Sequence, residues 1–245
     1  MQIHIYDHPE QVGIAAAMII GAQILKKPNA VLGLATGSTP IPVYQQLTRL
    51  HREGILDFSS VVTFNLDEYC GIPKTHHCSY YYFMQKQLFE HINIIPSNTH
   101  VPNGCASDIP AECRQYDGAI QQAGGIDLQL LGIGRNGHIG FNEPYDQFIY
   151  GCHMVELSAS TISDNQRFFN SEDQVPHRAI SMGVGSIMEA KTVLLVATGI
   201  EKSIAVKKAL DEDINPETQV SILRTHPNGI FLLDRSAASD IMIGS

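Results

Sequence analysis

The chain has 245 residues, 44% of them hydrophobic, and a formal net charge of −9 at pH 7. This hydrophobic fraction argues against a disordered chain, and the length is sufficient for a fully buried core. The negative charge argues against nucleic-acid binding, which usually requires a basic face. It still permits an anionic small substrate, because a few local cations and backbone N–H groups can bind a phosphate.

From the N-terminus, we expect a strand over residues 3–6 and a buried helix over residues 12–25. Asp7 is the expected N-cap of this helix, and Pro9 suits its first turn. The apolar stretch is too short to span a membrane and has no basic leader. We therefore expect neither a targeting signal nor a membrane partner.

Strand-like and helix-like segments then alternate along the chain. Further strands are expected at residues 31–35, 61–66, 126–131, 153–157, 193–197 and 229–233, and helices at about 40–52, 79–91, 110–123 and 201–210. Apolar strands separated by helices indicate a mainly parallel sheet covered on both faces. We predict an α/β fold with a single domain over residues 1–245, in which the polar, irregular segment 145–178 could form a small lid.

The cysteines are expected to be reduced thiols in a cytoplasmic protein, because their spacing is not that of a disulfide scaffold. They are Cys70, Cys78, Cys105, Cys113 and Cys152. His76 and His77 precede Cys78, but this spacing matches no zinc pattern, so we predict no metal site.

Two loops that follow expected strands carry polar side chains. The turn from Thr36 through Gly37, Ser38 and Thr39 to Pro40 offers N–H groups and hydroxyls at a helix start. It could bind a phosphate or simply cap the helix. Asp67 and Glu68 follow the strand at residues 61–66, where a carboxylate could be a general base or a helix cap.

The glycine-rich run from Leu131 to Pro144 follows another buried strand and contains His138 and Glu143, an acid–base pair. Its glycines at 132, 134 and 137 match the dinucleotide-binding pattern literally. That pattern requires a helix after the third glycine, and the sequence Phe-Asn-Glu-Pro ends any helix within about one turn. We therefore do not predict dinucleotide binding, although an incidental histidine in a glycine loop stays an alternative. Arg167 and Lys202 are further candidates for an anion site or ordinary surface charges.

Taken together, these pieces resemble the glucosamine-6-phosphate deaminases over nearly the whole chain. The matching stretches are Leu34–Pro40, Asn65–Tyr69, Gly132–Pro144, Arg167–Phe169 and Ser181–Ser186. The run Gly-His-Ile-Gly-Phe-Asn-Glu-Pro is the most specific of them. The resemblance implies a Rossmann-like three-layer domain that opens the sugar ring, isomerises it and releases ammonia, with glucosamine 6-phosphate as substrate and no metal or redox cofactor.

The resemblance also implies roles for individual residues. His138 resembles the residue that shuttles the ring-opening proton, supported by Glu143 and by Asn136. Asp67 resembles the base that removes the C2 proton. The phosphate would be held by Thr36, Gly37, Ser38, Thr39, Gly134, Arg167 and Lys202.

This chain departs from the family pattern at three places. Some members have an aspartate at the position of Asn136, and an amide can orient an imidazole but stabilises imidazolium less well. Asp146, His153 and Val155 stand where allosteric members carry a serine and two basic residues, so we predict no activation by N-acetylglucosamine 6-phosphate. The sequence at residues 145–147, Tyr-Asp-Gln, is bulkier and more acidic than expected.

Two other functions stay open at this point. The related 6-phosphogluconolactonases share the Gly-His turn but do not need Asp67 as an enolising base. A non-catalytic sugar-phosphate sensor would keep the binding loops without turnover, and the presence of Asp67, His138 and Glu143 together favours an enzyme. The choice between monomer and homo-oligomer is open as well.

Overall fold

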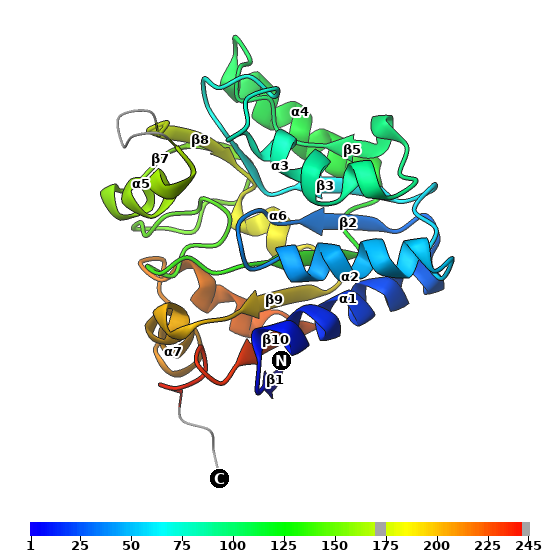
Figure 1. Ribbon diagram of the computed structural model, residues 1–245. Helices are drawn as coiled ribbons and strands as arrows, with labels where there is room; N and C mark the ends of the chain where they lie inside the picture. Colours follow the sequence, from blue (N-terminus) through cyan, green and yellow to red (C-terminus); the bar gives the residue numbers. More distant parts are fainter. Residues whose placement is uncertain (170–174, 242–245) are drawn as a thin grey trace.

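The computed structural model describes residues 1–169 and 175–241. Within these ranges the main sheet has seven strands in the order β1–β10–β9–β6–β2–β3–β5, and all neighbours run parallel (Figure 1). The strands are β1 (Gln2–Tyr6), β2 (Val31–Leu34), β3 (Val62–Asn65), β5 (Thr99–His100), β6 (Leu128–Leu131), β9 (Val193–Ala197) and β10 (Gly229–Asp234). This confirms the predicted α/β class with a mainly parallel sheet.

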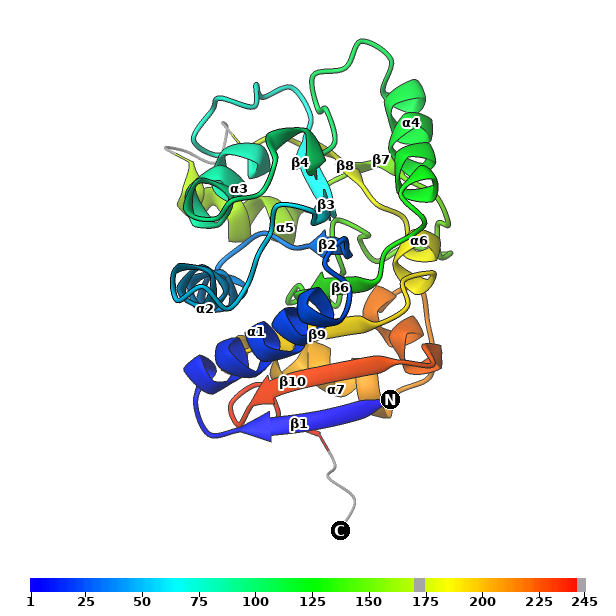
Figure 2. The same cartoon turned by 90° about the vertical axis from the view of Figure 1, so that its right-hand side faces the viewer.

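The strands at the centre of the sheet are apolar because both of their faces are covered. Every residue of β2, β6 and β9 is buried. Helices α1 (Pro9–Lys26) and α2 (Ile41–Arg52) lie on one side of the sheet, and α4 (Ile109–Gln122) and α6 (Val184–Met188) on the other (Figure 2). Burial on both faces requires continuous hydrophobic runs rather than alternation.

The start of α1 differs from the expectation. Its N-cap is His8 and not Asp7, and the Gln11 side chain accepts a hydrogen bond from the His8 N–H at 3.0 Å. The reason is Pro9, which occupies the first helical turn and requires an extended residue immediately before it. Asp7 instead forms an ion pair with Arg235 next to β10.

A second, antiparallel sheet was not predicted. It consists of β4 (Asp67–Tyr69), β8 (Arg178–Ser181) and β7 (His153–Glu156), in the order β4–β8–β7. Residues 67–69 were expected to end the strand at 61–66, and β8 was not expected at all. The chain in fact leaves the main sheet at Leu66 and enters the small sheet directly.

The small sheet has its own cluster of buried side chains. It comprises Tyr69, Phe141, Leu157, Ile162, Val175 and Ala179. Helix α5 (Ala159–Asn165) supplies Ile162 to this cluster, and the short 3-10 helix Gln166–Phe168 follows it. The proposed lid segment 145–178 thus contains β7 and α5, and its residues 170–174 lie outside the described part. The single domain and the lid stay predictions.

The remaining helices are α3 (Tyr80–Gln87) and α7 (Ser203–Asp211). α3 is shorter than the helix expected over residues 79–91, because residues 89–91 form a separate 3-10 turn. No helix in the described ranges is both long and apolar enough to cross a membrane.

Candidate active site

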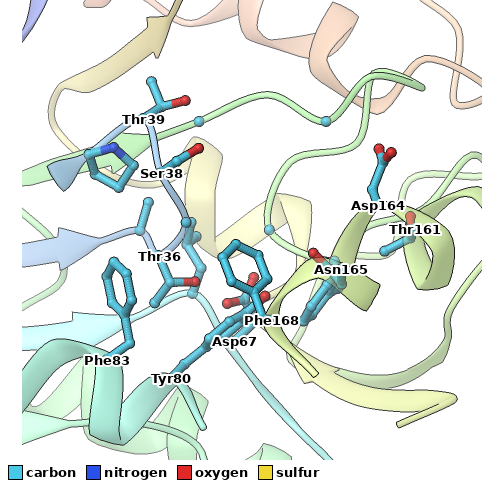
Figure 3. A pocket seen from close by; sticks show the side chains of 18 of the residues that line it. Thr36, Ser38, Thr39, Asp67, Tyr80, Phe83, Thr161, Asp164, Asn165 and Phe168 are labelled. Carbon is cyan, nitrogen blue, oxygen red and sulfur yellow. The ribbon is translucent and has the colours of Figure 1, made fainter. Parts of the chain in front are cut away.

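A cavity of about 220 Å³ lies where the segments that follow β2, β3, β6 and β9 meet (Figure 3). The carboxyl ends of parallel strands are the usual ligand site of such sheets. Nine of the predicted site residues line this cavity: Thr36, Gly37, Ser38, Thr39, Asp67, Gly134, His138, Arg167 and Lys202. Asn136 and Glu143 are not in its lining and lie behind His138.

The hydroxyl loop, residues 36–40, connects β2 to α2. Gly37 has a φ of +100°, a left-handed conformation that favours glycine. In the described part of the chain, no acceptor takes a hydrogen bond from the N–H groups of Gly37, Ser38 or Thr39. Free N–H groups and hydroxyls before a helix form a ready anion site. The loop therefore has the chemistry of a phosphate cradle, although it also leads into α2.

Asp67 and Glu68 are adjacent but have different surroundings. The Asp67 carboxyl lines the cavity, and only 5% of the residue is exposed. Burial, followed by the nearby charge of Glu68, raises its pKa well above the usual range. Glu68 points away and accepts hydrogen bonds from the N–H groups of Tyr80 and Tyr81 at 2.9 Å. Of the two functions considered for this pair, Asp67 thus has the environment of a general base and Glu68 caps α3.

The His138 imidazole packs where the side chain of residue 134 would be, so this position has to be a glycine. A Cβ on Gly134 would lie 2.3 Å from the His138 ring, so the ring packs directly on the Gly134 backbone. The turn between them is closed by a hydrogen bond from the Gly134 N–H to the His138 carbonyl at 2.9 Å. Gly134 was predicted to bind phosphate, and the structure gives it this additional role in positioning the imidazole.

Glu143 and Asn136 support His138 from behind the cavity. The Asn136 amide donates to Glu143 Oε2 at 2.8 Å, and its oxygen accepts from the His138 N–H at 3.2 Å. His138 Nδ1 is 3.7 Å from Glu143 Oε2 and is buried without a partner among the described residues. This distance exceeds the usual range of hydrogen-bond lengths by about 0.5 Å, so a small ring movement would form one.

The environment of the His138 ring favours its neutral form. Burial lowers the pKa of His138, and the charge of Glu143 opposes this effect without reversing it. A neutral imidazole can accept a proton from a substrate hydroxyl, and Glu143 would then stabilise the imidazolium.

Three cations line the cavity, Arg135, Arg167 and Lys202, together with the carboxylates of Asp164 and Glu201. Burial lowers the pKa of Lys202; the charges of Glu201 and Asp164 oppose this shift, and the charges of Arg135 and Arg167 add to it. Arg135 also forms an ion pair of 3.3 Å with Asp164, and both residues line the cavity. The two carboxylates offset part of this positive charge, and an anion bound beside Lys202 and Arg167 would offset more of it.

Sequence reasoning missed several cavity residues. They include Tyr80, Phe83, Arg135, Thr161, Asp164, Asn165 and Phe168. Figure 3 shows Thr161, Asp164 and Asn165 projecting from one helix, α5. The Tyr80 hydroxyl donates to the Tyr69 hydroxyl at 3.3 Å, and the residue lies at the start of α3, where only its position in the helix could have indicated it. Arg135 lies inside the glycine-rich run and could have been considered as a third cation there.

Comparisons with known proteins identify the family of this chain. The sequence model of the family described as glucosamine-6-phosphate isomerases/6-phosphogluconolactonase matches residues 10–229. This chain belongs to that family. A glucosamine-6-phosphate deaminase of Clostridioides difficile is 53% identical over 226 residues, which are 92% of this chain and 91% of the relative.

Solved structures show how widely this fold is shared. A monomeric glucosamine-6-phosphate deaminase superposes with a TM-score of 0.96 at 43% identity, covering 98% of this chain and 100% of that chain. A 6-phosphogluconolactonase from Trypanosoma brucei superposes with a TM-score of 0.74 at 21% identity, covering 98% of each chain. At that identity the second match shows the fold alone, so the family fold does not by itself distinguish the two activities.

Proposed function

We propose that this protein is a glucosamine-6-phosphate deaminase, which converts glucosamine 6-phosphate and water to fructose 6-phosphate and ammonia. The main support within the structure is Asp67, a buried carboxyl in the same cavity as His138 and the cation group. Aldose–ketose isomerisation needs a base at C2 and a separate proton carrier at the ring oxygen. The high similarity to the named deaminases supports the same conclusion.

In the proposed mechanism, His138 opens the pyranose ring. It accepts the proton of the C1 hydroxyl and delivers it to the ring oxygen, and the Glu143 carboxylate stabilises the transient imidazolium. Asp67 then removes the proton from C2, and protonation of the resulting enolamine at C1 gives a ketimine. Addition of water to C2 of the ketimine and loss of the amino group release ammonia and leave the ketose.

The phosphate would bind away from the reacting carbons. The free N–H groups of the hydroxyl loop and the side chains of Arg167 and Lys202 supply both hydrogen bonds and charge. Anchoring the far end of the sugar converts its binding energy into correct placement of C1 and C2 between Asp67 and His138. Ser38 and Thr39 add hydroxyl donors to the same loop.

The lactonase alternative explains fewer of these features. Hydrolysis of a lactone needs an activated water and a phosphate anchor, but no carboxyl with a raised pKa at an enolisable carbon. A sensor would need no acid–base pair at all. Asp67 is therefore the residue that favours the deaminase over both alternatives.

One assay separates the three functions. The protein is incubated with glucosamine 6-phosphate, and ammonia and fructose 6-phosphate are measured; we expect both in equal amounts. Hydrolysis of 6-phosphogluconolactone without ammonia release would move the assignment to the lactonase. Binding of glucosamine 6-phosphate without either reaction would support the sensor.

We place this reaction in the cytoplasm. All five cysteines are free thiols, which suits a reducing compartment. The similarity to a monomeric deaminase supports a monomer, which can be checked by light scattering of the purified protein.

A further inference from the structure

The turn before α3 holds three metal-ligating side chains in succession, His76, His77 and Cys78. The sequence alone predicts no metal here, because the spacing matches no zinc pattern. The folded turn changes that expectation. One ligand atom from each of the three residues lies within 4.8 Å of the other two.

Hydrogen bonds fix the shape of this turn. The His76 N–H donates to the Pro73 carbonyl at 2.8 Å, and the Ser79 N–H donates to the His76 carbonyl at 2.9 Å. The Ser79 hydroxyl also donates to the Lys74 carbonyl at 2.9 Å. The three consecutive side chains are therefore presented together by a closed turn and not by a freely moving loop.

The two imidazole rings lie against each other. The rings of His76 and His77 stack with their centroids 4.5 Å apart and their planes 27° apart. Tetrahedral zinc, with bonds of about 2.0–2.3 Å, requires its ligand atoms to be roughly 3.3–3.7 Å apart. Because the three ligand atoms lie within 4.8 Å of one another, side-chain rotation has to bring them closer by roughly 1–1.5 Å at most.

We propose that His76, His77 and Cys78 form a binding site for Zn²⁺ or a similar transition-metal ion at the rim of the cavity. Two imidazoles and one thiolate are borderline-soft ligands, which select such ions over Mg²⁺ or Ca²⁺. Three protein ligands leave a fourth position for water or an exogenous ligand. The site is distinct from Asp67 and His138, which carry the proposed deaminase reaction.

Metal binding would cost two weak contacts. The Cys78 thiol donates to the Phe168 carbonyl at 2.8 Å, and this bond is lost when the thiol proton leaves for solvent. The Cys78 N–H bond to His76 Nδ1, at 3.2 Å, is lost when His76 rotates or changes tautomer. Each is a single hydrogen bond, and the metal–ligand bonds that replace them are stronger.

Occupancy of this site would affect the cavity. His77, Cys78 and Phe168 all line it, so a bound cation would release Phe168 from Cys78 and change the cavity rim. We therefore expect Zn²⁺ to inhibit turnover. This consequence depends on the proposed deaminase function, whereas metal binding itself does not.

The test measures metal binding directly. The reduced, metal-free full-length protein is titrated with Zn²⁺ by calorimetry and with Co²⁺ by absorption, because a thiolate–cobalt charge-transfer band reports Cys78 as a ligand. Cys78→Ser and His77→Ala are expected to weaken Zn²⁺ binding by about 100-fold. Cys105→Ser is the matched control, because Cys105 is an exposed thiol that also donates to a backbone carbonyl, that of Ile72.

The outcomes are distinguishable. Equal Zn²⁺ affinity in the wild type, Cys78→Ser and His77→Ala, or no thiolate–cobalt band, would overturn the proposal. If Cys78→Ser does not fold, the exposed His77→Ala change still provides the comparison. Zn²⁺ inhibition that a chelator reverses, and that His77→Ala reduces, is expected for the deaminase reaction; absence of that reaction would refute the proposed function and leave the binding result intact.

Discussion

Replacing Asp67 with asparagine should stabilise the protein while nearly abolishing its activity. The carboxyl is buried, and in the described part of the chain no donor gives it a hydrogen bond. Burial raises the pKa of Asp67 above that of the unfolded chain. Its deprotonation therefore favours unfolding, and the wild type loses stability as the pH rises from the unfolded pKa to the folded pKa.

The size of this effect follows from linkage. Each unit by which folding raises the pKa of Asp67 corresponds to about 1.4 kcal/mol at pH values above both pKa values. For a chain of this size, that equals about 3–5 °C in Tm per unit. The Tm of Asp67→Asn minus that of the wild type should rise with pH and then reach a plateau. Any fixed cost of burying the amide shifts the whole curve and leaves its shape unchanged.

The assay is thermal unfolding of both proteins from pH 4 to pH 9, together with the pH profile of kcat/KM for the wild type. Loss of a general base should reduce kcat by about 10²- to 10⁴-fold. The acid limb of kcat/KM in the wild type should fall at the pH where the Tm difference levels off, since both report Asp67 in the free enzyme.

Asp57→Asn is the matched control for this experiment. Asp57 is exposed, and a hydrogen bond from the Ser59 N–H lowers its pKa, so removing its charge should have the opposite sign with pH. A Tm difference for Asp67→Asn that is flat or falls with pH would refute the assignment of Asp67 as a buried base.

Further outcomes test the supporting residues and the regulation. Asn136→Ala removes two hydrogen bonds that connect Glu143 to the His138 loop and should lower kcat/KM by about 10- to 100-fold; an unchanged rate would exclude its assigned role. Lys202→Ala should raise KM about 10- to 100-fold by removing a charged phosphate ligand, whereas Lys207→Ala, on the exposed face of α7, should leave KM unchanged. Gly37→Ala should destabilise by about 1–3 kcal/mol in thermal unfolding because of its φ of +100°, while Gly118→Ala in α4 should stabilise slightly. Finally, the rate should depend hyperbolically on glucosamine 6-phosphate, and N-acetylglucosamine 6-phosphate should not change the curve; a sigmoidal curve that it converts to a hyperbola would contradict this.

The sequence was sufficient to predict the strands that consist of continuous hydrophobic residues. The strands at residues 31–34, 128–131 and 193–197 are fully buried, and such runs have a strong signal in any one segment. The small sheet was not predictable in the same way. β4 has three residues, and its partner β8 lies more than 100 residues later, so neither strand carries a local signal of its pairing.

For the candidate site as well, the sequence predicted some features and not others. The motifs identified Asp67 and His138 because their residue types and positions after strands suggest chemistry. They could not show that Asn136, not His138, makes the hydrogen bond to Glu143 in this structure. That arrangement depends on a difference of about 0.5 Å in a glycine-rich turn, which residue spacing does not determine.

Leu66 alone connects β3 of the main sheet to β4 of the small sheet. The residues of the proposed active site are therefore positioned by two different sheets. Asp67 is the first residue of the small sheet, whereas His138 follows β6 of the main sheet. The position of Asp67 relative to His138 therefore depends on how the small sheet packs against the main sheet. Changes in the small cluster around Tyr69 and Phe141 could tilt Asp67 against His138 and retune the enzyme without altering any side chain that a substrate touches.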